Sequence, residues 1–97
     1  TRCVNLVFTA GYGSDVEKVK EILTKTAESC PRVVAEPAPY ARLSKLGDSA
    51  LEFILFAWCK SEEYRNACFD LTESVKEAFD KESIEIPYQK LDINILK

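Results

Sequence analysis

The segment from Pro37 to Trp58 constrains the fold most, because it places a tight turn between two strand-like runs. The sequence LGDSAL at positions 46–51 has the Gly, Asp and Ser residues typical of a hairpin turn. The run after the turn is apolar on both faces: Leu51, Phe53, Leu55 and Ala57 share one face, and Glu52, Ile54, Phe56 and Trp58 share the other. A small single-sheet domain cannot cover both faces by itself. We therefore expect part of this strand to need a cover from elsewhere.

The remaining pattern predicts further strands and two helices around this hairpin. Apolar residues alternate in the strand-like runs, and they recur every three or four positions in the helical ones. The expected elements are a strand over Cys3–Thr9, a helix from a capping box at Ser14 and Glu17 to about Ser29, a short extended piece at Arg32–Val34, hairpin strands over Tyr40–Leu46 and Leu51–Lys60, a helix capped by Ser61, a strand over Ile84–Ile86 closed by Pro87, and an alternating tail over Leu91–Ile95.

Right-handed crossovers arrange this order as an α+β, ferredoxin-like βαββαβ sandwich, with an antiparallel sheet and both helices on one face. A chain of 97 residues with 46% hydrophobic content is long enough for one core. We expect one domain over residues 1–88 and a C-terminal extra strand or tail over residues 89–97. The chain starts at Thr1 and contains no Met, so we expect it to be part of a longer polypeptide. No apolar run approaches the ~20 residues that span a bilayer, so any membrane part is expected elsewhere in that polypeptide.

Composition argues against several classes of function. The net charge is −3 with acids and bases interleaved, which disfavours a nucleic-acid surface. Histidine is absent, and Cys3, Cys30, Cys59 and Cys68 lack a C-x-x-C spacing, so no metal, cofactor or catalytic site is expected. The Asp and Ser of the turn are typical turn formers rather than a reactive pair. We expect reduced, mostly buried thiols in an intracellular domain, with a disulfide or a reactive thiol as the alternative.

The helix-free face of the second hairpin strand is the first candidate site. Since the helices cover one face of the sheet, Ile54, Phe56 and Trp58 are expected on the other. These three side chains would expose an apolar area comparable to the largest patch of a typical monomer. Either the connector at Arg32–Pro39 or the C-terminal tail folds over them, or they form a subunit interface.

The alternating tail is the second candidate site. Leu91, Ile93 and Ile95 make an amphipathic strand that follows Pro87. A strand with unpaired N–H and C=O groups needs a pairing partner. The tail is either an edge strand of the same sheet or a strand that pairs between chains, including closure into a barrel.

Three groups of motifs, in this order along nearly the whole chain, resemble the small-conductance mechanosensitive channel family. They are Gly11-Tyr12 with Asp15 and Ile22-Leu23; Pro37-x-Pro39 leading to LGDSAL-x-Phe53 and Trp58; and Val75-Lys76-x-x-Phe79 leading to Ile84-x-Ile86-Pro87-Tyr88 and Leu91-Asp92-Ile93-Asn94. Members of the family often have arginine at the position of Phe56, so this face is more apolar here.

The resemblance implies a domain without catalytic chemistry in the lower part of a cytoplasmic vestibule. Seven copies would form a cage with portals for ions and small solutes, and the segment Leu91–Ile95 would be one strand of a barrel that closes the cage floor. The partners expected are further copies of the chain, with no nucleic acid, and with the membrane only through a part outside these residues. An ACT-type regulatory module that binds a small molecule has the same element order and is the alternative. An acylphosphatase-like enzyme also has this layout, but the sequence lacks its glycine-rich loop with a phosphate-binding arginine.

Overall fold

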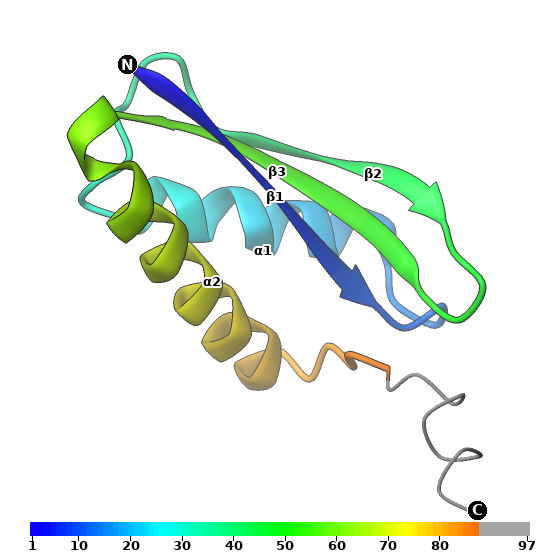
Figure 1. Ribbon diagram of the computed structural model, residues 1–97. Coiled ribbons are helices and arrows are strands. Elements are labelled where there is room, and N and C mark those ends of the chain that lie inside the picture. The colour runs from blue at the N-terminus through cyan, green and yellow to red at the C-terminus, as the bar shows by residue number, and fades with distance from the viewer. Residues whose placement is uncertain (88–97) are drawn as a thin grey trace, which may run out of the picture.

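The computed structural model describes residues 1–87, so the boundary expected at residue 88 and the tail over residues 89–97 lie outside the described residues. Figure 1 shows the arrangement of the elements. They are β1 (Arg2–Ala10), α1 (Val16–Ser29), β2 (Tyr40–Leu46), β3 (Leu51–Cys59), the 3-10 turn η1 (Ser61–Glu63) and α2 (Tyr64–Lys81). The predicted helices and hairpin are thus present, with bounds that differ by up to three residues.

The described strands form an antiparallel sheet with the order β1-β3-β2. Pairing between β1 and β3 runs without interruption from Arg2 opposite Cys59 to Ala10 opposite Leu51. Pairing between β2 and β3 shifts at a bulge between Leu43 and Lys45. The α+β class with an antiparallel sheet and two helices is confirmed.

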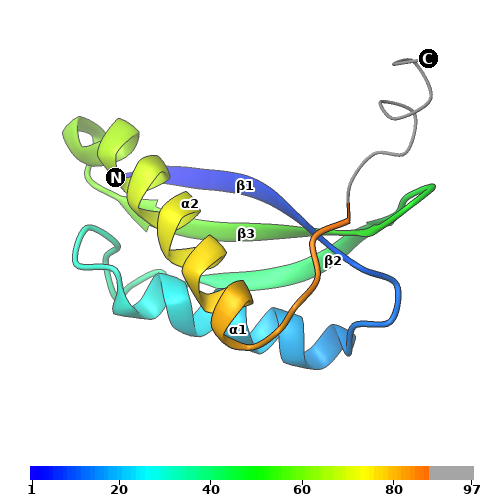
Figure 2. The ribbon, with the colours of Figure 1, turned by 90° about the horizontal axis from the view of Figure 1, so that it is seen from below.

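Both helices lie on the same side of the sheet, as the view in Figure 2 shows. The core lies between the two layers, and three regular series of buried side chains form most of it. They are Leu51, Phe53, Leu55, Ala57 and Cys59 of β3, Val19, Leu23 and Ala27 of α1, and Ala67, Leu71, Val75 and Phe79 of α2. Because the inward face of β3 is committed to this core, its outward face must find cover elsewhere or stay exposed.

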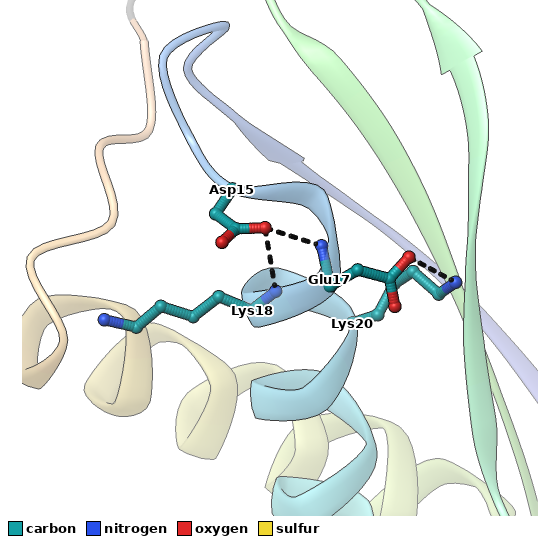
Figure 3. A network of polar contacts seen from close by, with 4 residues as sticks. All are labelled: Asp15, Glu17, Lys18 and Lys20. Carbon is teal, nitrogen blue, oxygen red and sulfur yellow. Dashed lines mark hydrogen bonds and ion pairs between the residues drawn. The ribbon is translucent and has the colours of Figure 1, made fainter.

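The first turn of α1 differs from the expected capping box. Asp15, and not Ser14, is the N-cap: its carboxylate accepts hydrogen bonds from the N–H groups of Glu17 at 3.0 Å and Lys18 at 3.5 Å (Figure 3). The N–H of Ser14 donates to the C=O of Gly11 at 3.0 Å, so Ser14 belongs to the preceding turn. The helix therefore begins one residue later than the sequence pattern indicates.

The entry to α2 also differs from the prediction, because Ser61 is not its cap. Residues Ser61–Glu63 form the turn η1, which Lys60 precedes, and α2 follows from Tyr64. No side-chain cap bond closes η1 or α2 at this end. The first N–H groups of a helix have no partner within it, and a 3-10 turn can satisfy some of them through its tighter i→i+3 hydrogen bonds. This explains how α2 starts without a capping side chain.

Residues 84–86 do not form the expected strand. The C=O of Glu85 accepts one backbone hydrogen bond from the N–H of Gly11 at 2.8 Å, and the N–H of Ile84 donates to the C=O of Phe79 at 2.8 Å. A further step of an antiparallel ladder would fall on Pro87, which has no N–H to donate. The segment therefore lies at the end of β1, where a ferredoxin-like fold has its fourth strand, without extending the three-stranded sheet of the described residues.

Candidate functional site: an apolar sheet face

The outward side chains of the three strands form one continuous surface, which we call the open face. It comprises Ile54, Phe56 and Trp58 of β3, Val7 of β1 and Tyr40 of β2. Val7 pairs with Ile54 and Tyr40 pairs with Phe56, so these side chains are cross-strand neighbours. Figure 1 looks onto this face, with α1 behind the strands and α2 beside β1.

Aromatic packing organises the β2–β3 side of the open face. The ring of Tyr40 stacks on the ring of Phe56, with centroids 4.8 Å apart and an interplanar angle of 27°. The centroids of Tyr40 and Trp58 lie 6.2 Å apart. Such offset and tilted arrangements are favourable for aromatic rings. They leave the three β3 side chains half-buried, while Val7 remains 58% and Tyr40 44% exposed.

The start of the connector lies beside β3, in the plane of the sheet. The N–H of Val34 donates to the C=O of Trp58 at 2.8 Å, and Val33 forms a bridge with Cys59. The short extended piece expected at Arg32–Val34 is present at Val33 and Val34 only, because Arg32 lies in a turn in which the N–H of Val33 donates to the C=O of Cys30 at 3.1 Å. Because these residues pair with the C-terminal end of β3, beyond the stretch that β2 covers, they lie beside the sheet and not over the open face.

Arg32 ties this connector to the helix layer. Its guanidinium donates to the Asp70 carboxylate at 2.9 Å and to the Glu63 carboxylate. The hydrogen bond to Glu63, followed by the one to Asp70, raises the pKa of Arg32 above its ordinary value. The two carboxylates thus stabilise the charged form of the guanidinium.

Polar residues surround the apolar centre of the open face. Arg42 of β2 lies opposite Ile54, Asn5 of β1 lies opposite Phe56, and Glu52 lies opposite Thr9. An apolar, aromatic centre with a polar rim is the usual composition of a protein–protein interface. The arrangement supports packing against another surface.

The groups that could carry other chemistry are placed differently. The Asp and Ser at positions 48 and 49 lie in the β2–β3 turn, which the N–H of Gly47 closes by donating to the C=O of Ala50 at 2.9 Å. Cys30 and Cys59 are buried, Cys3 and Cys68 are partly buried, and all four thiols are free. Burial raises the pKa of the Cys59 thiol, which keeps it protonated and unreactive. Within residues 1–87 there is no group of three His, Cys, Asp or Glu side chains placed to hold a metal ion.

Comparison with known proteins identifies the family. Residues 4–86 match the family model described as "Mechanosensitive ion channel MscS, C-terminal". The chain belongs to the MscS family. This membership decides between the channel domain and the ACT-type module, which element order alone could not separate.

Relatives in this family match along almost the whole chain. An uncharacterized MscS family protein of Synechocystis sp. is 35% identical over 96 residues, which cover 99% of this chain and 32% of the relative. A small-conductance mechanosensitive channel of Helicobacter pylori is 33% identical over 95 residues, which cover 97% of this chain and 35% of the relative. The chain thus spans about a third of the length of these MscS proteins.

Two solved structures have the same fold as this chain. The crystal structure of Helicobacter pylori MscS in the closed state superposes with a TM-score of 0.85 and 30% identity, over 92% of this chain and 36% of that one. Arabidopsis thaliana MSL1, solved by cryo-electron microscopy, superposes with a TM-score of 0.71 at 15% identity, over 91% of this chain and 34% of that one. The second likeness shows the fold alone. Neither helix within residues 1–87 of this MscS family member is long and apolar enough to cross a membrane.

The predicted site residues and the observed face overlap in part. The structure places Ile54, Phe56 and Trp58 together on the helix-free side of β3. Leu91, Ile93 and Ile95 lie outside the described residues. Sequence reasoning did not assign Val7 and Tyr40 to this surface, because only the strand register brings them beside Ile54 and Phe56.

Proposed function

We propose that the chain is the cytoplasmic C-terminal assembly domain of a tension-gated channel subunit. Membership of the MscS family supports this assignment, together with the likeness to a solved MscS channel at 30% identity. In this proposal the domain has no catalytic role, and its work is to hold subunits together beneath the membrane. The observation that carries it is the open face, because an aromatic surface that no helix of residues 1–87 covers fits a neighbouring copy.

The chemistry of the open face suits contact between subunits. Tyr, Trp and Phe are enriched in the cores of interfaces, and truncation of a central aromatic residue commonly costs about 2 kcal/mol or more of binding free energy. Phe56 and Trp58 are half-buried and already packed against Tyr40, so they lose little side-chain freedom on association. The packing within each domain thus lowers the entropy cost of bringing the subunits together.

The finer features of the proposal come from the resemblance to the family. Seven copies form a cage on the cytoplasmic side, and ions and small solutes reach the pore through openings between its parts. Leu91, Ile93 and Ile95 pair between chains, because an alternating strand needs backbone partners. In this arrangement the open face joins the domains, and the tails join the chains below them.

The test is Trp58→Ser in a channel subunit that carries this domain. Loss of a central aromatic contact should weaken subunit association about 30-fold, corresponding to ~2 kcal/mol. Native mass spectrometry or sedimentation of the detergent-solubilised channel gives the fraction of assembled subunits. Survival of cells after osmotic downshift, with this channel as their only one, reports function.

The matched control is Phe69→Ser, which removes an exposed aromatic side chain from α2 on the helix side of the molecule. This control should leave both assembly and survival unchanged. Equal assembly of wild type and Trp58→Ser, with the domain still folded by circular dichroism, would contradict the open face as an interface.

A further inference from the structure

The C-terminal end of β3 carries Trp58 of the open face, and β2 does not reach it. The last residue of β3 that pairs with β2 is Phe56. Beyond this point the connector takes the place of β2. The C=O of Trp58 accepts a hydrogen bond from the N–H of Val34 at 2.8 Å, and Val33 forms a bridge with Cys59. The position of the connector therefore determines how this end of the open face is supported.

The connector, residues 31–39, has little apolar packing of its own. Only Pro39 is buried, residues 35–38 are exposed, and Val33 packs against the core while remaining partly buried. A hollow of about 510 Å³ lies between the connector and the residues of η1 and α2, and a second of about 240 Å³ lies beside Glu28 of α1. Segments with few buried apolar contacts open locally at a small cost in free energy. Polar contacts must therefore contribute much of what holds the connector in place.

Arg32 supplies the ion pairs of the connector. Its guanidinium donates to the Asp70 carboxylate of α2 at 2.9 Å and to the Glu63 carboxylate of η1. Within residues 1–87, the connector makes no other ion pair. A single exposed ion pair contributes little, but a guanidinium that bonds two carboxylates on separate elements forms a network. Because Arg32 comes two residues before Val34, this network holds the connector beside Trp58.

The β1 side of the same end is secured differently. Arg2 lies opposite Cys59, and its guanidinium carbon lies 3.7 Å from the ring centroid of Tyr64, the first residue of α2. The ladder between β1 and β3 is unbroken from Arg2 to Ala10. The β1 side is thus fixed by regular pairing, whereas the connector side depends on Arg32.

We propose that Arg32 is a positioning residue for the open face. By holding the connector against the end of β3, Arg32 fixes the backbone of Trp58 and with it the placement of the indole ring that a neighbouring copy contacts. The connector leads into Tyr40, whose ring centroid lies 6.2 Å from that of Trp58, so its release would loosen the aromatic packing at both residues. A less ordered surface loses more side-chain freedom on association and binds more weakly. This inference rests on the proposed function and deepens it, because it names a residue outside the open face on which assembly depends.

Hydrogen exchange tests whether Arg32 holds the connector, in a channel subunit that carries this domain. Arg32→Gln should speed exchange of the Val34 amide about tenfold and leave the amide of Leu71 in the core unchanged. The matched control is Lys76→Gln, which breaks an exposed ion pair with Asp80 on α2 and should change neither rate. Unchanged exchange at Val34 in Arg32→Gln would overturn the proposal. Equal acceleration at Leu71 would also overturn it, because Arg32 would then act on the whole fold.

Subunit association tests whether Arg32 acts through Trp58. By native mass spectrometry or sedimentation, Arg32→Gln should weaken association about fivefold. Arg32→Lys should weaken it less, because lysine keeps the charge but lacks the planar fork of donors. In the Trp58→Ser background, Arg32→Gln should weaken association less than about twofold further, since residues that act through one another are not additive.

Two results would overturn the positioning role: full additivity of the two substitutions, or association of Arg32→Gln equal to wild type. If Trp58→Ser weakens assembly and Arg32→Gln does not, the proposed function stands and only the role of Arg32 fails. If Trp58→Ser leaves assembly unchanged, both proposals fail.

Discussion

At the scale of single residues, the β2–β3 turn depends on Gly47. A Cβ atom at this position would lie 2.8 Å from the C=O oxygen of Ala50, a distance that requires the backbone to move. Gly47→Ala should therefore lower the free energy of unfolding by about 1–3 kcal/mol, the range typical of strained substitutions. Urea denaturation followed by circular dichroism measures this change through the transition midpoint and slope.

Gly13 provides the control for this prediction. A Cβ atom at Gly13 would meet nothing within 4 Å, and the backbone angles of the described glycines are open to alanine. Gly13→Ala should leave stability unchanged or raise it by about 0.4–1 kcal/mol, because alanine restricts the unfolded chain. If both variants lose the same amount of stability, close approach to Ala50 is not the reason for glycine at position 47.

At the scale of elements, α1 depends on its N-terminal cap. Asp15→Ala removes the carboxylate that accepts hydrogen bonds from the first turn, and it should cost about 1 kcal/mol of unfolding free energy. Asp15→Asn keeps a capping oxygen and should lose less. Ser14→Ala should be nearly neutral, since the structure does not use this side chain as the cap. Thermal or urea unfolding of the three variants checks the order, and a larger loss at Ser14 than at Asp15 would contradict the observed cap.

The elements also show which parts of the secondary structure could be predicted from the sequence. The hairpin and both helices were predictable, because the LGDSAL turn signal separates strand-like runs of seven and nine residues, and the helical repeat extends over 14 and 18 residues. The cap and the strand over Ile84–Ile86 were not, because each depends on one or two hydrogen bonds. Ser14 and Asp15 are both good capping residues, and only the backbone of the turn decides between them. Ile84–Ile86 alternates like a strand, yet only one of its carbonyls finds a partner on Gly11.

At the scale of the whole molecule, the part of the open face that β3 contributes could be predicted from the sequence. Alternation in β3 is sufficient to put Ile54, Phe56 and Trp58 on the face opposite the core. The extent of the open face required the sheet order and register, which bring Val7 and Tyr40 beside them from distant parts of the sequence.

Thiol alkylation tests the packing of the whole molecule. The two-layer core buries Cys30 and Cys59, whereas Cys3 and Cys68 are partly exposed. Burial also raises the pKa of the Cys59 thiol, which lowers its reactive thiolate fraction near pH 8. Native protein treated with iodoacetamide should therefore be labelled at Cys3 and Cys68 first, with Cys30 and Cys59 labelled only as fast as the domain opens. Mass spectrometry of proteolytic peptides gives the rate at each site, and urea should equalise all four. Rapid labelling of Cys59 in the native state would mean that β3 does not sit beneath the helices.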